Sequence, residues 1–114
     1  MKTIIPAFAA MLLSSTMALA HSDLTASFPA DGTWIDPSVT KLAMTFGKEI
    51  RLVTVTIGPE GGDATTLDLD EQNSLSTEFE LALPALETGP YTIEWRGLGE
   101  DGHVMTGQIR FAVK

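Results

Sequence analysis

A strict alternation of apolar and polar side chains runs through five segments of the chain and limits what it can fold into. A period of two places every second side chain on one face of a β-strand, so that one face is buried and the other meets solvent. The apolar members are Leu42, Met44 and Phe46; Val53, Val55 and Ile57; Phe79, Leu81 and Leu83; Tyr91, Ile93 and Trp95; and Ile109, Phe111 and Val113. The pattern predicts strands over residues 41–46, 52–57, 78–83, 91–96 and 108–113.

Turn-forming residues separate these segments, and no segment shows the apolar stripe of a helix. Clusters rich in Pro, Gly and Asp occupy residues 29–32 and 58–63, and Gly and Pro recur within residues 87–90. Residues 24–28 and 65–69 are two weaker strand candidates. About seven short strands in one small domain predict an all-β fold, an antiparallel Greek-key β-sandwich or barrel of the immunoglobulin-like kind. We expect Trp34 and Trp95 to lie in its core.

The first twenty residues have the layout of a secretory signal. Lys2 gives a positive start, an apolar run follows at residues 4–13, and Ala18 and Ala20 are small residues at the positions that a signal peptidase reads. This run is shorter than the roughly 20 residues that span a bilayer. We therefore predict a cleaved signal peptide at residues 1–20 and one mature domain at residues 21–114. The alternative, an uncleaved amphipathic anchor, is disfavoured by the Ala-x-Ala site.

Composition excludes several classes of function. The chain has no cysteine, which excludes disulfides, thiolate zinc sites, iron–sulfur clusters and cysteine nucleophiles. The formal net charge is −8 with only 7 Lys and Arg, and loss of Lys2 makes the mature domain more negative still. Nucleic-acid binding requires clustered basic residues, so it is excluded too. A domain this small without disulfides needs a compact sheet core or a bound metal.

The two histidines of the chain are its best candidates for metal ligands. After cleavage His21 is the first residue, and it can then offer its free α-amine and its ring Nδ1 to one metal ion as a six-membered chelate. The ordinary pKa values, about 7.7–8.0 for the amine and about 6.5 for imidazole, mean that few protons are displaced near neutrality. Asp101 and His103 are two positions apart and so project to the same face of an extended segment. Three nitrogens and one carboxylate oxygen favour Cu(II) over Zn(II).

Each candidate ligand also has an ordinary interpretation. Asp-Gly is a common turn, the histidine after it is often merely exposed, and an amino-terminal histidine is often merely solvated. A different copper motif, with histidine at the third mature position, is absent because Asp23 stands there. We expect Asp23, Asp36 and Glu100 to add a negative field that attracts cations to the site.

A series of short motifs runs through residues 21–114, beginning with His21. The others are Phe28-Pro29-Ala30-Asp31-Gly32, similar to P-A-D/E-G; residues 42–46, similar to L-x-x-x-F; Leu83-Pro84-Ala85-Leu86 and Gly89-Pro90-Tyr91-Thr92-Ile93-Glu94-Trp95-Arg96, similar to L-P-x-L-x-x-G-x-Y-x-V-x-W-R; and Asp101-Gly102-His103 with Gly107 and Phe111, similar to D-G-H-x-x-x-G-x-x-x-F. Each motif alone is weak, but their order and spacing after a signal peptide are specific. With these motifs, residues 21–114 resemble the CopC family of periplasmic copper-resistance proteins.

The resemblance implies a cupredoxin-like Greek-key fold and a Cu(II) site made by the amino-terminal histidine and the Asp-x-His motif. These positions are His21, Asp101 and His103 in this sequence. We expect one Cu(II) per mature chain, a periplasmic location and a monomer. The implied partner is a membrane copper importer of the CopD kind or another copper-resistance component.

The chain departs from the family's pattern at its methionines. Some members carry a methionine-rich loop that binds Cu(I), whereas residues 21–114 contain only Met44 and Met105. Met44 shares the alternating face of Leu42 and Phe46, so we expect it in the core, and we expect Met105 to be a packing residue. Because thioethers select Cu(I), their scarcity predicts a Cu(II)-only member.

A second departure lies after Phe46, where the family usually reads F-S-E-P. Here the sequence is Phe46-Gly47-Lys48-Glu49, so the acidic residue is displaced or lost. The altered motif therefore predicts no role for an acidic residue at this point.

The leading hypothesis is a periplasmic Cu(II)-binding protein that buffers copper or delivers it to a partner, and that is not an enzyme. One alternative is a small copper-dependent oxidase or monooxygenase with an amino-terminal histidine chelate. Against it, the mature domain leaves little room for a substrate surface, and a carboxylate ligand favours Cu(II) and hinders reduction. The other alternative is a metal-free immunoglobulin-like interaction module.

Overall fold

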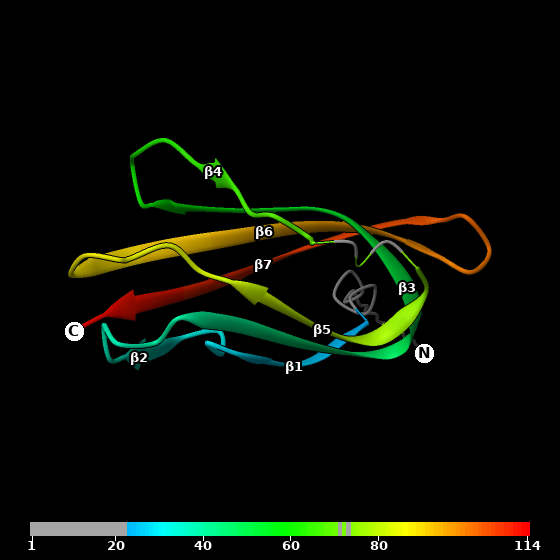
Figure 1. Cartoon of the computed structure of the whole chain (residues 1–114), viewed down its shortest axis with the longest axis horizontal. Helices are drawn as coiled ribbons and strands as arrows, with labels where there is room; N and C mark the ends of the chain where they lie inside the picture. The colour runs from blue at the N-terminus through cyan, green and yellow to red at the C-terminus, as the bar shows by residue number, and fades with distance from the viewer. Residues whose placement is uncertain (1–22, 71, 73) are drawn as a thin grey trace, which may run out of the picture.

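Seven β-strands form the fold in the computed structural model, which describes residues 23–70, 72 and 74–114 (Figure 1). In chain order the strands are β1 (Leu24–Phe28), β2 (Thr33–Ile35), β3 (Lys41–Pro59), β4 (Thr65–Thr66), β5 (Ser76–Ala82), β6 (Gly89–Gly99) and β7 (Val104–Val113). Across the described ranges there is no helix that could cross a lipid bilayer. The predicted signal peptide at residues 1–20 lies outside the described residues.

The strands hydrogen-bond into one continuous sheet that curls on itself. The order is β1–β3–β6–β7–β2, with β4 and β5 also paired to β3, and every pairing is antiparallel except that of β2 with β7. The curl brings the two edge strands, β1 and β2, to the same side of the molecule (Figure 1). The prediction of an all-β sandwich or barrel of about seven strands is confirmed.

Strand β3 joins two segments that the alternation predicts as separate strands. Its first part pairs with β1 and β5, and its second part pairs with β6 and β4, so it passes from one layer of the curled sheet to the other. The register with β5 shifts between Thr45 and Ile50, and the three residues Gly47, Lys48 and Glu49 are exposed there. The polar interruption of the alternation is thus a bend within one strand rather than a connection between two.

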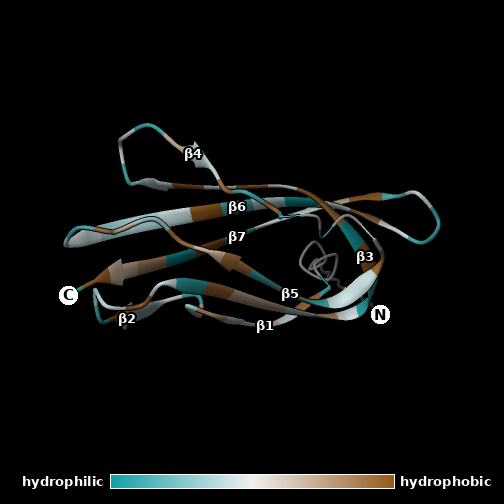
Figure 2. Cartoon of the chain, viewed as in Figure 1, coloured by the Kyte–Doolittle hydropathy of each residue, from teal (hydrophilic) through white to brown (hydrophobic). Residues whose placement is uncertain are grey.

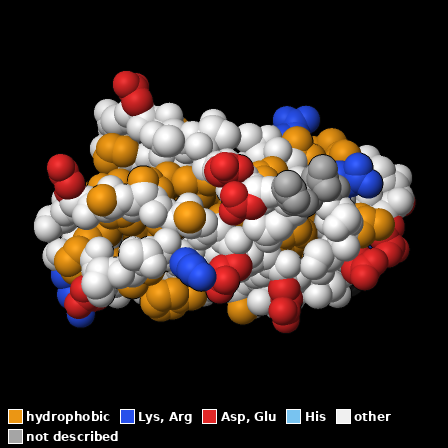
Figure 3. Space-filling model, in the orientation of Figure 1, with side chains coloured by type: hydrophobic (Ala, Val, Ile, Leu, Met, Phe, Trp, Pro, Cys, Tyr) orange, Lys and Arg blue, Asp and Glu red, His pale blue; other side chains and the backbone are white. Residues whose placement is uncertain are grey.

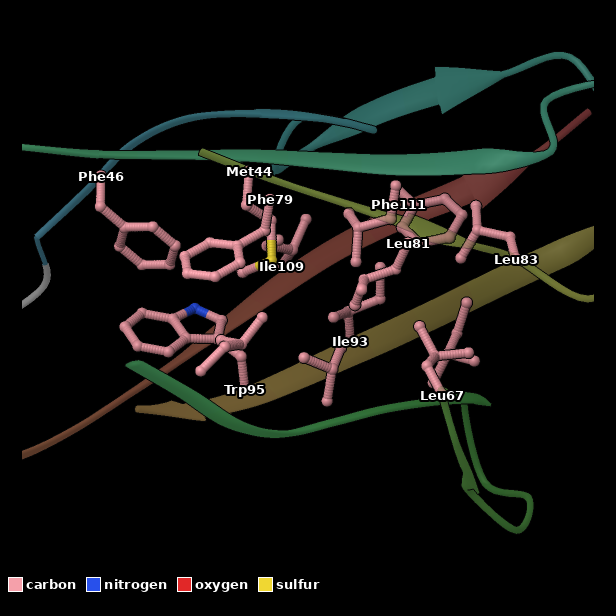
Figure 4. Packing of buried hydrophobic residues seen from close by; sticks show 14 of the residues in the cluster. Met44, Phe46, Leu67, Phe79, Leu81, Leu83, Ile93, Trp95, Ile109 and Phe111 are labelled. Carbon is pink, nitrogen blue, oxygen red and sulfur yellow. The ribbon is translucent and has the colours of Figure 1, made fainter. Parts of the chain in front are cut away.

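Buried apolar side chains from β3, β5, β6 and β7 fill the space between the layers (Figures 2 and 4). The ring of Phe46 packs edge-to-face against Phe79 and Trp95, with centroids 5.8 and 5.1 Å away. Met44 is 1% exposed and lies in this cluster, as the alternation predicts. Of the described residues, no polar or charged one is buried, so the domain is held mainly by apolar burial at about 25 cal/mol per Å².

Three sequence-based expectations are wrong in detail. Val53 is expected on the buried face, but the register of β3 with β6 shifts between Leu52 and Thr54, and this bulge leaves Val53 exposed. Trp34 is expected in the core, but it lies on the short edge strand β2 and is 68% exposed. The weak candidate at residues 65–69 yields only the two-residue strand β4.

Gly107 lies opposite Trp95 in the β6–β7 pairing, and the indole ring lies directly over it. A Cβ at Gly107 would stand 2.6 Å from Nε1 and 2.7 Å from Cε2 of Trp95. We expect Gly107→Ala to lower the free energy of unfolding by about 1–3 kcal/mol, because the ring has to shift within a packed core. Urea denaturation measures this change. Thr106→Ala, an exposed position on the same strand, is the control, and an equal effect of the two substitutions would refute the packing argument.

Candidate metal centre

The connection between β6 and β7 is a tight turn built around glycine. The backbone N–H of Gly102 donates to the carbonyl of Gly99 at 3.0 Å, and the N–H of Gly99 donates to the carbonyl of His103 at 2.9 Å. Gly102 has φ +86°, in the left-handed region that other residues seldom adopt. A turn followed by a left-handed glycine is a common three-residue hairpin connection. It places Asp101 and His103 on either side of that glycine.

Asp101 and His103 contact each other through two hydrogen bonds. Nδ1 of His103 lies 2.8 Å from Oδ2 of Asp101, and the backbone N–H of His103 donates to Oδ1 at 3.1 Å. Both side chains are exposed, at 69% for Asp101 and 83% for His103. The expected convergence of the carboxylate and the ring is therefore present. The contact places a ring nitrogen and a carboxylate oxygen side by side on one turn, where both could bind a metal ion that replaces the hydrogen bond between them.

The same contact shifts the titration of the carboxyl group. The side-chain hydrogen bond from His103, and after it the backbone N–H of that residue, hold the pKa of Asp101 below its ordinary value of 3.8. Because the pKa is lowered in the folded state, ionisation of Asp101 stabilises the fold at any pH above the ordinary pKa. This stabilisation is lost as the pH falls through the lowered pKa. The carboxylate is thus ionised throughout the neutral range.

We expect His103→Ala to raise the pKa of Asp101 part of the way toward 3.8. The substitution removes the ring, which is the largest cause of the lowering, but keeps the backbone donor at residue 103. A pH titration of the Asp101 carboxyl carbon by NMR in the metal-free protein measures the change. An unchanged titration midpoint in His103→Ala would mean that the ring does not hold the carboxylate.

A cavity of about 840 Å³ lies between this turn and the bend of β3, and charged side chains make up half of the residues that line it. Besides Asp101 and His103 its lining includes Asp23, Glu100, Lys48 and Glu49. Acidic side chains gather at the end of the molecule where the β6–β7 turn lies (Figure 3). Four carboxylates against one lysine give the cavity a negative field that attracts cations.

Two acidic residues, Glu49 and Asp36, are placed relative to the cavity in ways that the sequence does not predict. Glu49, to which the altered motif assigns no role, lines the cavity because it lies on the exposed bend of β3. Its signal in the sequence is the polar break in the alternation after Phe46. Asp36 is expected near the site but does not line the cavity, since its carboxylate accepts the N–H of Ser38 at 2.9 Å in a different loop.

The third predicted ligand, His21, lies outside the described residues. The described ranges, which begin at residue 23, contain no group of three or more His, Asp or Glu side chains placed to hold a metal ion. The structure therefore brings together two of the three predicted ligands, Asp101 and His103. One imidazole and one ionised carboxylate suit a divalent copper ion.

Comparison with known proteins gives a consistent result. Residues 24–114 match the model of the CopC domain. A curated relative, Copper resistance protein C of Pseudomonas syringae pv. tomato, is 27% identical over 127 residues, covering 94% of this chain and 91% of the relative.

Two solved structures share the fold. CopC from Methylosinus trichosporium OB3b superimposes with a TM-score of 0.66 at 23% identity, covering 82% of this chain and 94% of the other. PcoC from Escherichia coli, described as a methionine-rich copper resistance protein, superimposes with a TM-score of 0.57 at 20% identity, covering 82% and 99%.

Proposed function

Because the chain belongs to the CopC family of copper-binding resistance proteins, we propose that it binds one Cu(II) per mature chain in the periplasm and buffers it or delivers it to a partner. The family consists of binding proteins rather than enzymes, which removes the oxidase alternative. The observation that carries the proposal is the Asp101–His103 pair at the rim of an acidic cavity.

The proposed ligands are His21, Asp101 and His103. His103 supplies one ring nitrogen and Asp101 supplies one carboxylate oxygen. The 2.8 Å contact between Nδ1 and Oδ2 supports this pair, because the two donor atoms lie side by side. His21 supplies its α-amine and its ring. In support of its place in the set, Asp23 lines the cavity and follows His21 by two residues in the sequence, a span of at most about 7 Å.

Copper is the cargo of this site, and the exposure of its ligands supports exchange. Asp101 and His103 are each more than two-thirds exposed, so a partner's ligands can approach the ion from solvent. The carboxylates around them attract the free cation, and such a field speeds its arrival. This arrangement favours capture and transfer of copper. The proposed partner is a membrane copper importer of the CopD kind, and the proposed state of this chain is a monomer.

The experiment is to recover the chain from the periplasmic fraction of copper-fed cells and to measure its first residue and metal content by mass spectrometry. We expect a chain that begins at His21 and carries one copper ion. Recovery of the chain in the cytoplasm, or of a processed chain without copper, would contradict the proposal.

A further inference from the structure

Met105 occupies the position on β7 between the candidate metal centre and the core. Alternate residues of β7 face inward, and Met105 precedes Gly107, Ile109 and Phe111 in this inward row. Its cross-strand neighbour on β6 is Gly97. Met105 is only partly buried, and it packs against the core cluster on one side, as the sequence predicts, while it lines the metal cavity on the other.

The end of the Met105 side chain and the Asp101 carboxylate both lie against Gly99, which has no side chain to keep them away. A Cβ at Gly99 would stand 3.4 Å from Cε of Met105 and 3.2 Å from Oδ1 of Asp101. Both side chains thus close over the same spot at the end of β6. His103 precedes Met105 by two residues and lies just before β7 begins. A ring nitrogen, a carboxylate and a thioether therefore border one cavity.

Met44, the other methionine of the mature domain, lies in a different environment from Met105. Met44 is 1% exposed, and its sulfur lies among the core rings, away from the cavity (Figure 4). Among the described residues that line the cavity, Met105 is the only sulfur donor. Soft thioethers select Cu(I), carboxylate oxygens favour harder ions, and imidazole serves both oxidation states of copper.

We propose that Met105 and His103 form a Cu(I) position in the same cavity, an inference that rests on the proposed copper-binding function. The pair gives one soft donor and one imidazole, which suits the low coordination number of Cu(I). Asp101 takes no part in this position. This proposal differs from the expectation of a Cu(II)-only member, which rests on the missing methionine cluster.

The first test is an anaerobic competition of the exported, processed protein against a Cu(I) chelator, with Cu(I) supplied directly. We expect Met105→Leu to lower the ratio of Cu(I) to Cu(II) affinity at least about tenfold, while the control Met44→Leu keeps the parent ratio. Leucine conserves volume, so the variants are expected to fold. An unchanged ratio in Met105→Leu would overturn the inference.

The second test needs no variant. X-ray absorption at the copper edge of the Cu(I)-loaded parent should show one sulfur neighbour, and a first coordination sphere of nitrogen and oxygen alone would overturn the inference.

The two proposals can fail separately. A parent that binds Cu(II) but shows no sulfur neighbour for Cu(I) loses only the Met105 position, whereas a parent that binds no Cu(II) loses the proposed function.

Discussion

One extra residue before His21 is expected to lower Cu(II) affinity at least about a hundredfold. A chain that keeps Ala20 turns the α-amine of His21 into a peptide nitrogen, which carries no free lone pair for a metal near neutral pH. The six-membered chelate of amine and ring is then lost, and only the ring of His21 remains. Losing a group that only orients a ligand typically lowers metal affinity 10–100-fold, and losing a ligand atom itself should lower it more.

A competition titration with a Cu(II) chelator compares the two amino termini. The matched control is the processed chain with Ser22→Ala, which changes the neighbouring side chain but keeps the free amine of His21. We expect this control to bind like the parent. Equal affinity of the Ala20-extended chain and the parent would remove the amine from the proposed site.

His103→Ala is expected to have a comparably large effect and to weaken Cu(II) binding more than Asp101→Ala does. His103 contributes a nitrogen donor that water replaces poorly, whereas a water oxygen can stand in for a carboxylate oxygen. For Asp101→Ala we expect a loss of roughly 10–100-fold, since the ion loses one oxygen donor but keeps the ring of His103, which lies 2.8 Å from that carboxylate in the parent. Both residues are exposed on a turn, so the fold should persist in each variant.

The control for these variants removes a carboxylate elsewhere. Asp36 does not line the cavity. Asp36→Ala should therefore keep the Cu(II) affinity within about twofold of that of the parent, because surface charges at a distance are screened. Circular dichroism checks that each variant is folded. Parent-like Cu(II) binding by His103→Ala would contradict its assignment as a ligand.

Local pattern predicts much of this fold because a half-buried sheet leaves a period-two record in the sequence. Leu42, Met44 and Phe46 are all buried as the alternation requires. The Asp101–His103 contact is predictable from local sequence as well, since residues two positions apart project to the same side of an extended segment. Neither prediction depends on contacts between distant parts of the chain.

The remaining features depend on long-range pairing that a local pattern does not contain. The bulge that exposes Val53 is defined by the register of β3 against β6, and the exposure of Trp34 follows from its place on an edge strand beside β7. Glu49 reaches the cavity only because the bend of β3 lies across from the β6–β7 turn. In each case the deciding partner is far away in the sequence.

The central claim is that His21, Asp101 and His103 together hold one Cu(II) ion, and electron paramagnetic resonance during a copper titration of the processed chain tests it most directly. We expect the signal of bound Cu(II) to saturate at one equivalent and to show coupling to nitrogen nuclei that changes in His103→Ala. A spectrum that shows no nitrogen coupling, or a titration in which no Cu(II) binds, would contradict the claim.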